Sequence, residues 1–409
     1  MLSYPDALAL VLDHAAPATP VERPLREAVG CVLAGDLHAK AASPSFDNSA
    51  MDGYAIRSVD TVGASAEKPA RLTISRTFAA GDAGTNVALS AGEAAGIMTG
   101  APVPPGAVSI IPVEMTQQDG DTVLISAPYP AERNIRRKGS DFAVGDLLLA
   151  GGTLITSAAI PLLAASGHER FRVRPRPCVW WISTGRELVD EPGRQLLPGQ
   201  IYNSSGPYGE TALRAAGCDC LGRTTVGDDG ESFRRALDTA LESPADVIVS
   251  TGAVSVGTYD FVRAEIEAMG AEILLHRARV KPGKPILFAK LRDGRHFFGL
   301  PGNPVSTAMG LRMFAVPFLR ALAGLPTEAP VKARLSDEVS ATKGLTVFLK
   351  AGLFEDDGRL VVTPFDGQES YKLHSMALMN AWIVHPEGVE SLKGGEMVNC
   401  YPADRSLFA

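Results

Sequence analysis

The segment between residues 178 and 324 constrains the fold most, because runs with strand character alternate there with runs with helical character. The apolar runs 178–183 and 246–250 predict buried strands, and the apolar spacing of 206–216 and 305–322 predicts helices. Further strands are expected at 221–226 and near Ile273, Ile286 and Phe297, and further helices at 232–241 and 261–269. Strands that alternate with helices of this length form a mostly parallel sheet covered on both faces. Such α/β sheets bind ligands at the carboxyl ends of their strands.

The rest of the chain has a different pattern. Between residues 33 and 149 the apolar runs are short and divided by Gly and Pro, which predicts a β-rich module. Helical spacing at 4–12 and again at 157–166 indicates that this module is inserted into a helical piece. After residue 326 short β runs return, as expected for a small C-terminal barrel or sandwich. A chain of 409 residues is too long for one core, so several domains are expected.

Composition excludes several classes of protein. The chain has 39 lysine and arginine residues and 46 aspartate and glutamate residues. Its net negative charge disfavours general nucleic-acid binding. The 5 cysteines include no C-x-x-C pair, which argues against a disulfide framework and a zinc site. The first residues lack a signal-peptide pattern, and no stretch approaches the roughly 18 apolar residues of a membrane span. We therefore expect a soluble cytoplasmic protein without nucleic-acid or membrane partners.

Small, turn-forming residues follow three of the predicted strands. The motifs are ISTG at 182–185, VSTG at 249–252 with SVG at 255–257, and FGLPGNP at 298–304. Hydroxyls and bare amides at the ends of parallel strands form an anion site, so a phosphate-bearing ligand is implied. A single junction of this kind is explained by turn geometry alone, since any α/β fold needs glycine there. Three junctions at one sheet edge favour the interpretation as an anion-binding site. The chain has neither a P-loop nor a dinucleotide fingerprint.

Two basic segments are further candidates. Lys281 and Lys284 lie on a KPGKP stretch, where proline and glycine fix the directions of two ammonium groups as an oxyanion site requires. A solvated turn with incidental lysines is the alternative. The stretch 133–141 is the most basic of the chain and fits an exposed loop, a phosphate clamp or, least well, a nucleic-acid patch.

Carboxylates follow the strand ends of the α/β segment. Glu187, Asp228 and Asp260 suit Mg²⁺ near phosphates, since this ion keeps several waters and takes one or two carboxylates. Capping of a helix is the alternative for each, and it is our interpretation for Asp229. In the β-rich module, Asp52 before Gly and Thr99 in a proline-rich loop read as turn residues when taken alone.

Several segments together resemble one known family. The matching segments are SFDNSAMDGYA (45–55), IMTGA (97–101), NIRRKGSD (134–141), STGREL (183–188), STGAVSVG (250–257), KPGKP (281–285) and GLPGNPVS (299–306). They resemble the MoeA family of molybdopterin molybdenumtransferases, which is related to the gephyrin E domain. The similarity runs in order from about residue 5 to 390.

The resemblance implies a multidomain α/β plus β fold. Its domains would be a helical linker at 1–32 and 143–176, an inserted β domain at 33–142, a MogA-like α/β molybdopterin-binding domain at 177–325, and a C-terminal β-barrel at 326–409. It also implies an elongated homodimer whose active-site cleft lies between the α/β domain of one subunit and the β domain of the other.

The resemblance implies a Mg²⁺-dependent reaction as well: adenylylated molybdopterin and molybdate react, AMP leaves, and the dithiolene holds molybdenum. Glu187, Asp228 and Asp260 would hold Mg²⁺. The implied catalytic residues are Asp52, Thr99, Asp141, Glu187, Lys281 and Lys284. The implied substrate contacts are Arg136, Ser183, Thr184, Gly252, Ser255, Pro301, Asn303, Pro304, Lys350 and Ser375.

The chain departs from the family pattern at two places. Lys350 stands where the family tends to have arginine, and lysine lacks the bidentate fork that suits an oxyanion. The segment 369–375 reads ESYKLHS instead of the expected glycine- and serine-rich sequence, which bears on Ser375. A tungstate-handling paralogue and a non-catalytic scaffold or sensor are the alternatives. The expected partners are a separate molybdopterin adenylyltransferase and acceptor molybdoenzymes.

Overall fold

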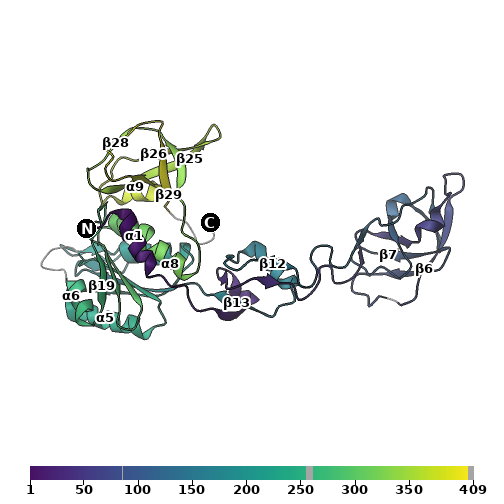
Figure 1. The fold of residues 1–409 in the computed structure, drawn as a ribbon, viewed down its shortest axis with the longest axis horizontal. Coiled ribbons are helices and arrows are strands. Elements are labelled where there is room, and N and C mark those ends of the chain that lie inside the picture. Colours follow the sequence, from purple (N-terminus) through teal and green to yellow (C-terminus); the bar gives the residue numbers. More distant parts are fainter. Residues whose placement is uncertain (85, 255–260, 404–409) are drawn as a thin grey trace. The chain divides into compact units, whose positions relative to one another are not determined.

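A computed structural model describes residues 1–84, 86–254 and 261–403, and some of its elements are labelled in Figure 1. The chain divides into two compact units. The first unit comprises Met1–Ala34, Gly152–Ser157 and Arg172–Ala409, and the second comprises Gly35–Gly151 and Ala158–Phe171. The four domain boundaries implied by the resemblance stay a prediction.

A six-stranded sheet forms the centre of the first unit. Its order is β17 (Asp219–Val226), β14 (Cys178–Thr184), β18 (Val247–Thr251), β22 (His296–Leu300), β21 (Leu287–Lys290) and β19 (Glu272–His276). The first four strands are parallel, and β21 and β19 continue the sheet in antiparallel pairing. The predicted α/β sheet, mostly parallel, is therefore confirmed.

Helices cover both faces of this sheet. One buried cluster joins Trp181 of β14 to α1 (Tyr4–Asp13), α4 (Ser205–Ala215), α7 (Pro304–Gly310) and α8 (Val316–Leu322). A second cluster joins Ile182 of the same strand to α5 (Gly230–Glu242) and α6 (Phe261–Ala268). Because neighbouring residues of a strand point to opposite faces, a strand buried on both faces is apolar throughout, as residues 178–182 are.

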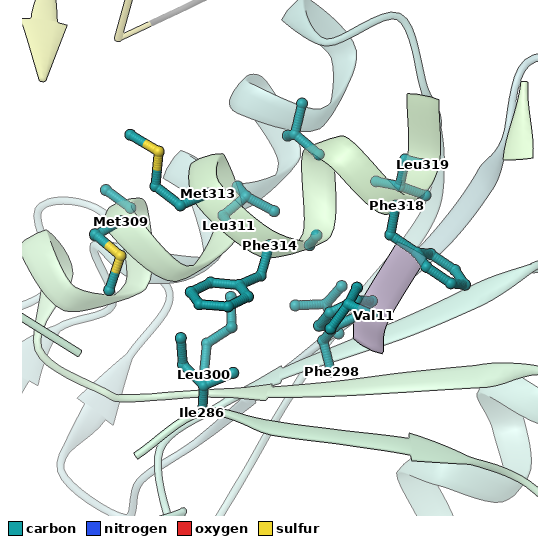
Figure 2. Packing of buried hydrophobic residues seen from close by; sticks show 14 of the residues in the cluster. Val11, Ile286, Phe298, Leu300, Met309, Leu311, Met313, Phe314, Phe318 and Leu319 are labelled. Carbon is teal, nitrogen blue, oxygen red and sulfur yellow. The ribbon is translucent and has the colours of Figure 1, made fainter. Parts of the chain in front are cut away.

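The helix that follows β22 is continuous from Pro304 to Leu322. Between α7 and α8 it takes a π-helical turn, Leu311–Ala315, just before Pro317. Proline lacks the amide hydrogen and crowds the preceding turn, and a wider turn accommodates it. Figure 2 shows Phe314 and Phe318 of this helix pointing toward the sheet, where Phe298 and Leu300 of β22 lie.

This helix corrects one expectation from the sequence. Its 19 residues are long and apolar enough to cross a membrane by length and composition, with a mean hydropathy of 1.2. However, 78% of that stretch is buried inside the protein. A buried helix that is apolar all round is also the pattern of a core helix.

A closed barrel forms the C-terminal part of the first unit. The strand order around the barrel is β25 (Thr346–Asp356), β26 (Arg359–Pro364), β23 (Val331–Leu335), β29 (Met397–Pro402) and β27 (Ala381–His385). The last strand, β27, pairs with β25 and closes the barrel. Of the two expected architectures, a barrel or a sandwich, the structure has the barrel. The strand β20 (Val280–Lys281) pairs with β25, and the short helix α9 (Leu373–Leu378) packs near β25.

The second unit contains a six-stranded β sheet. Its order is β8 (Ser109–Pro112), β5 (Gly53–Ile56), β7 (Glu93–Ile97), β6 (Ala70–Phe78), β10 (Thr122–Ile125) and β9 (Gln117–Asp119). Two short pairs join β4 (Asn48–Ser49) to β11 (Ile135–Arg136) and β3 (Leu37–His38) to β12 (Leu147–Leu149), and α3 spans Ile160–Ala165. The β-rich module expected here is present.

Short elements complete the chain. They are β1 (Val21–Pro24), α2 (Leu25–Ala28), β2 (Val32–Leu33), β13 (Arg170–Arg174), β15 (Leu188–Val189), β16 (Ile201–Tyr202), β24 (Val339–Ser340) and β28 (Ser391–Leu392). One-turn helices lie at Ser58–Thr61, Val113–Met115 and Ser157–Ala159.

Candidate functional site

The three strand-end motifs lie at one edge of the α/β sheet. The strands that carry them, β14, β18 and β22, are neighbours in the sheet and run parallel, and β17 adds Asp228 beside β14. A cleft of about 840 Å³ opens at this edge. Its lining includes Thr184, Glu187, Asp228, Gly252, Asn303 and Pro304. We call it the sheet-edge cleft.

Close packing of two strand ends forms part of its wall. The Thr184 hydroxyl donates to the carbonyl of Thr251 at 3.0 Å, and the Gly252 amide donates to the carbonyl of Leu300 at 3.0 Å. Gly252 has a φ of 90°, and a Cβ there would lie 2.5 Å from Thr184 Oγ1 and 2.6 Å from its carbonyl oxygen. Only glycine fits this position without displacing the backbone.

Two predicted substrate contacts face the core instead. Ser183 is fully buried, and its hydroxyl oxygen accepts the indole N–H of Trp181 at 3.2 Å. Pro301 is also buried, and its carbonyl accepts the hydroxyl of Thr307 at 2.6 Å. Neither residue lines the sheet-edge cleft, because their side chains belong to the packed layers beneath it. Their direct contact with the substrate stays a prediction, which this packing does not support.

Two of the three predicted metal ligands lie in the cleft. Glu187 and Asp228 both line it, and one oxygen of Asp228 accepts the amide of Arg186 at 3.2 Å. Asp260 and Ser255 lie outside the described residues. Within residues 1–84, 86–254 and 261–403 there is no group of three metal-ligating side chains. A pair of carboxylates nevertheless fits Mg²⁺, which takes one or two and keeps its waters.

Asp229 has the capping role that we assigned to it. It precedes α5 and its carboxylate accepts the amide of Ser232 at 2.8 Å. This hydrogen bond holds the pKa of Asp229 below its usual range, because it stabilises the charged form. The interpretation as a helix cap is confirmed.

A second cleft, of about 880 Å³, contains both predicted lysines. Lys281 and Lys284 line it together with the barrel residues 347–349 and the segment 368–371, and both lysines are exposed. Gly283 between them has a φ of 87°, and a Cβ there would lie 2.5 Å from Met309 Cε. Glycine thus lets the turn lie against α7 and direct both ammonium groups to solvent. We call this the lysine cleft.

Lys350 does not reach the lysine cleft. Its side chain is fully buried, and its ammonium donates to the carbonyls of Gly367 at 2.7 Å, Glu369 at 3.3 Å and Lys372 at 3.3 Å. Burial lowers the pKa of Lys350 from its usual value. Ser375 is buried beside it and donates to the Gly367 carbonyl at 2.9 Å. Both side chains are hydrogen-bonded to backbone here, and their contacts with the substrate stay a prediction.

The second unit brings Asp52 and Thr99 together. Both the amide and the hydroxyl of Thr99 donate to Asp52 Oδ1, at 2.6 Å and 2.9 Å. Both bonds hold the pKa of Asp52 below its usual range, and the bond from the amide has the larger effect. The loop before Asp52 also bonds to the 97–101 and 134–141 motifs. The Gly100 amide donates to the Ser49 carbonyl and the Ala50 amide donates to the Asn134 carbonyl, each at 2.8 Å.

The basic stretch 133–141 is partly neutralised by carboxylates. Arg137 pairs with Asp47 at 2.6 Å and with Glu132 at 2.5 Å, and these bonds raise the pKa of Arg137 further. Arg136 is exposed on β11, opposite Asn48. The Asp141 amide donates to Ser43 at 2.9 Å, so this residue also lies next to the 43–52 segment.

Sequence reasoning missed an apolar wall of the sheet-edge cleft. Leu196, Ile201, Tyr202, Tyr371 and Leu373 line it. Ile201 is 53% exposed and Tyr371 is 65% exposed. These residues lie outside the recognisable motifs, and an apolar side chain in a loop gives little indication of its neighbours before the fold is known. Flat or apolar walls are typical of sites that bind aromatic ligands.

Comparison with known proteins covers almost the whole chain. Residues 2–167 match the MoeA N-terminal region (domain I and II), residues 180–321 a probable molybdopterin binding domain, and residues 332–403 the MoeA C-terminal region (domain IV). The chain is 36% identical over 401 residues to a molybdopterin molybdenumtransferase of Synechococcus elongatus, covering 97% of this chain and 98% of the relative. It is 35% identical over 408 residues to molybdopterin molybdenumtransferase 2 of Mycobacterium tuberculosis, covering 98% and 99%.

A solved structure agrees with these relatives. The crystal structure of a molybdopterin biosynthesis MoeA protein from Pyrococcus horikoshii matches with a TM-score of 0.80 and 31% identity. The match covers 98% of this chain and 99% of that one.

Proposed function

This chain belongs to the MoeA family, whose members are molybdopterin molybdenumtransferases, and from that membership we propose that it inserts molybdenum from molybdate into adenylylated molybdopterin and releases AMP. The observation that carries the proposal is that two clefts of different chemistry share a lining residue, Tyr371. The sheet-edge cleft offers strand-end amides and carboxylates, and the lysine cleft offers two cations.

The sheet-edge cleft suits the phosphates of the adenylylated substrate. The amides and the Thr184 hydroxyl at the ends of parallel strands favour anions without adding net charge. Glu187 and Asp228 would hold Mg²⁺, which would neutralise charge on the phosphates and on the departing AMP. The apolar wall would exclude water from the phosphoanhydride and hold the flat rings of the substrate.

The lysine cleft suits the oxyanion. Lys281 and Lys284 place two ammonium groups beside one turn, and a divalent oxyanion such as molybdate matches both charges. Gly283 fixes the turn against α7, so that the two cations keep their spacing when the oxyanion arrives.

A test of the reaction is release of AMP from adenylylated molybdopterin with Mg²⁺, with and without molybdate. Glu187→Ala should abolish the molybdate-dependent release. Glu191→Ala is the matched control, because Glu191 belongs to an exposed ion pair with Arg194 and does not line the cleft. Tight binding without turnover by the unaltered chain would contradict the proposal and favour a scaffold or sensor.

We further propose that the protein acts as a homodimer in the cytoplasm. Asp52, Thr99, Arg136 and Asp141 would complete the site of the partner subunit, and a separate molybdopterin adenylyltransferase would supply the substrate. Acceptor molybdoenzymes would receive the product. The family membership supports this arrangement, as does the occurrence of the two groups of site residues in different compact units.

Mixed dimers test the shared site. Asp52→Ala and Glu187→Ala should each be inactive alone, and an equal mixture after exchange of subunits should regain about a quarter of the normal activity, because half of the dimers then carry one intact site of two. No recovery in a mixture whose subunits have exchanged would contradict a site shared between subunits.

A further inference from the structure

The segment 367–372 of the first unit forms a wall between the two clefts. Tyr371 is 65% exposed and lines both the sheet-edge cleft and the lysine cleft. Its neighbours Glu369 and Ser370 line the lysine cleft. An aromatic ring exposed at this point is placed where a ligand that spans both clefts would pass.

The barrel fixes this segment from one side. The Lys350 ammonium donates to the carbonyls of residues 367, 369 and 372, at 2.7, 3.3 and 3.3 Å. An ammonium group has three N–H donors. Because these carbonyls match all three donors, Lys350 has no donor left for an oxyanion, and its charge is satisfied by the loop itself.

Two further contacts complete the attachment. The Gln368 side chain accepts the Lys350 amide at 2.9 Å and donates to the Lys350 carbonyl at 2.9 Å, in the manner of a paired strand. On the other side, the Val305 amide of α7 donates to the Ser370 carbonyl at 3.1 Å. The backbone on both sides of Tyr371 is therefore held, one side by the barrel and the other by the α/β domain.

Resting on the function proposed above, we propose that Tyr371 stacks on a flat heteroaromatic ring of the substrate and that Lys350 is the positioning residue that holds it there. Stacking needs a ring kept at a fixed height and tilt, and a loop tied to buried polar groups on both sides provides this. The oxyanion is then bound by Lys281 and Lys284 without Lys350. The ring is the pterin or the adenine, and the two are separated by experiment.

The experiment measures ligand affinity without turnover. Adenylylated molybdopterin is titrated in the absence of molybdate into the unaltered protein and into Tyr371→Phe, Tyr371→Ala, Lys350→Met and the double variant Lys350→Met/Tyr371→Ala. AMP alone is titrated in parallel. Tyr371→Phe should bind within about twofold of the unaltered chain, and Tyr371→Ala should bind about tenfold more weakly, the usual effect of one lost aromatic stacking contact. A parallel loss for AMP identifies the ring as adenine, and an unchanged affinity for AMP identifies it as the pterin.

Lys350→Met should weaken the affinity as Tyr371→Ala does and should add nothing in the double variant, because both act through one ring. Trypsin cleavage after Lys372 should also become faster in Lys350→Met, and Lys350→Arg should restore part of both properties. If Lys350→Met fails to fold, the comparison of Tyr371→Phe with Tyr371→Ala decides, since that side chain is exposed.

The outcomes separate this inference from the proposed function. Equal affinities of Tyr371→Ala and the unaltered chain overturn the stacking proposal, whatever the turnover. A raised KM for molybdate in Lys350→Met, with unchanged affinity for adenylylated molybdopterin, overturns the positioning role. Normal affinity without AMP release refutes the proposed function and leaves the stacking inference in place, and an unaltered chain that binds no adenylylated molybdopterin refutes both.

Discussion

Replacing Arg312 by methionine should strongly destabilise the first unit. This guanidinium lies in the π-helical turn, donates to both carboxylate oxygens of Glu328 at 2.8 Å, and donates to the Pro402 carbonyl of the barrel at 2.9 Å. The two charged side chains are only 5% and 7% exposed. Methionine replaces the aliphatic part of the side chain but removes the Arg312 cation from the buried carboxylate of Glu328, which costs about 3–5 kcal/mol.

A matched pair of controls tests this reasoning. Lys343→Met removes one partner of the Lys343–Glu390 ion pair, whose side chains are 74% and 77% exposed, and should cost at most about 1 kcal/mol. The double variant Arg312→Met/Glu328→Met should recover most of the loss, because replacing a buried pair by apolar groups is often close to neutral.

Urea unfolding followed by tryptophan fluorescence is the appropriate measurement. The 3 tryptophans, at positions 180, 181 and 382, all belong to the first unit, so their emission reports on that unit. An Arg312→Met midpoint no lower than that of Lys343→Met would refute the assigned role of the buried pair. A double variant as unstable as the single one would show that the loss comes from packing and from the Pro402 contact.

The remaining predictions concern three local contacts. Gly283→Ala should lower the free energy of unfolding by about 1–2 kcal/mol because of the left-handed φ, and by more because the new Cβ would press on Met309. It should also raise the KM for molybdate. Thermal melts measure the first effect and steady-state kinetics the second. Thr99→Val should raise the pKa of Asp52 in a carboxyl NMR titration but leave it below the usual range, because the amide bond, the larger cause, remains. Asp229→Ala should lower the melting temperature at pH 7 without changing AMP release. Since the folded pKa of Asp229 is depressed, its contribution exists above the unfolded pKa and is lost as the pH falls through the folded one, so the two melting temperatures should converge in acid.

The sheet and its binding edge could be predicted because their signals are local. A buried strand, a small-residue turn and a helix follow one another at each junction, and parallel strands bring their carboxyl ends to one edge. The placement of Thr184, Gly252 and Asn303 at one cleft follows from this rule alone. Capping by Asp229 was predictable for the same reason, since it depends on residues within one helical turn.

The inward direction of Ser183 was predictable in principle and was missed. Residues two apart on a strand share a face, so Ser183 points with Trp181, which is a core residue. Resemblance to the family placed the STG motif at the substrate, and it did not distinguish the hydroxyl that faces the cleft from the one that faces the core. The strand's period gives that distinction directly.

The role of Lys350 depends on partners that no local pattern specifies. Three carbonyls from residues 367–372 surround its ammonium, and they come together only when the barrel closes and α9 packs near β25. An arginine at this position would present five donors in a rigid planar fork, and these cannot all point at carbonyls that converge on one ammonium nitrogen. A lysine has three donors on a flexible stem, and here the loop accepts all of them. With the positioning role proposed above for Lys350, the oxyanion is left to the two lysines on either side of Gly283.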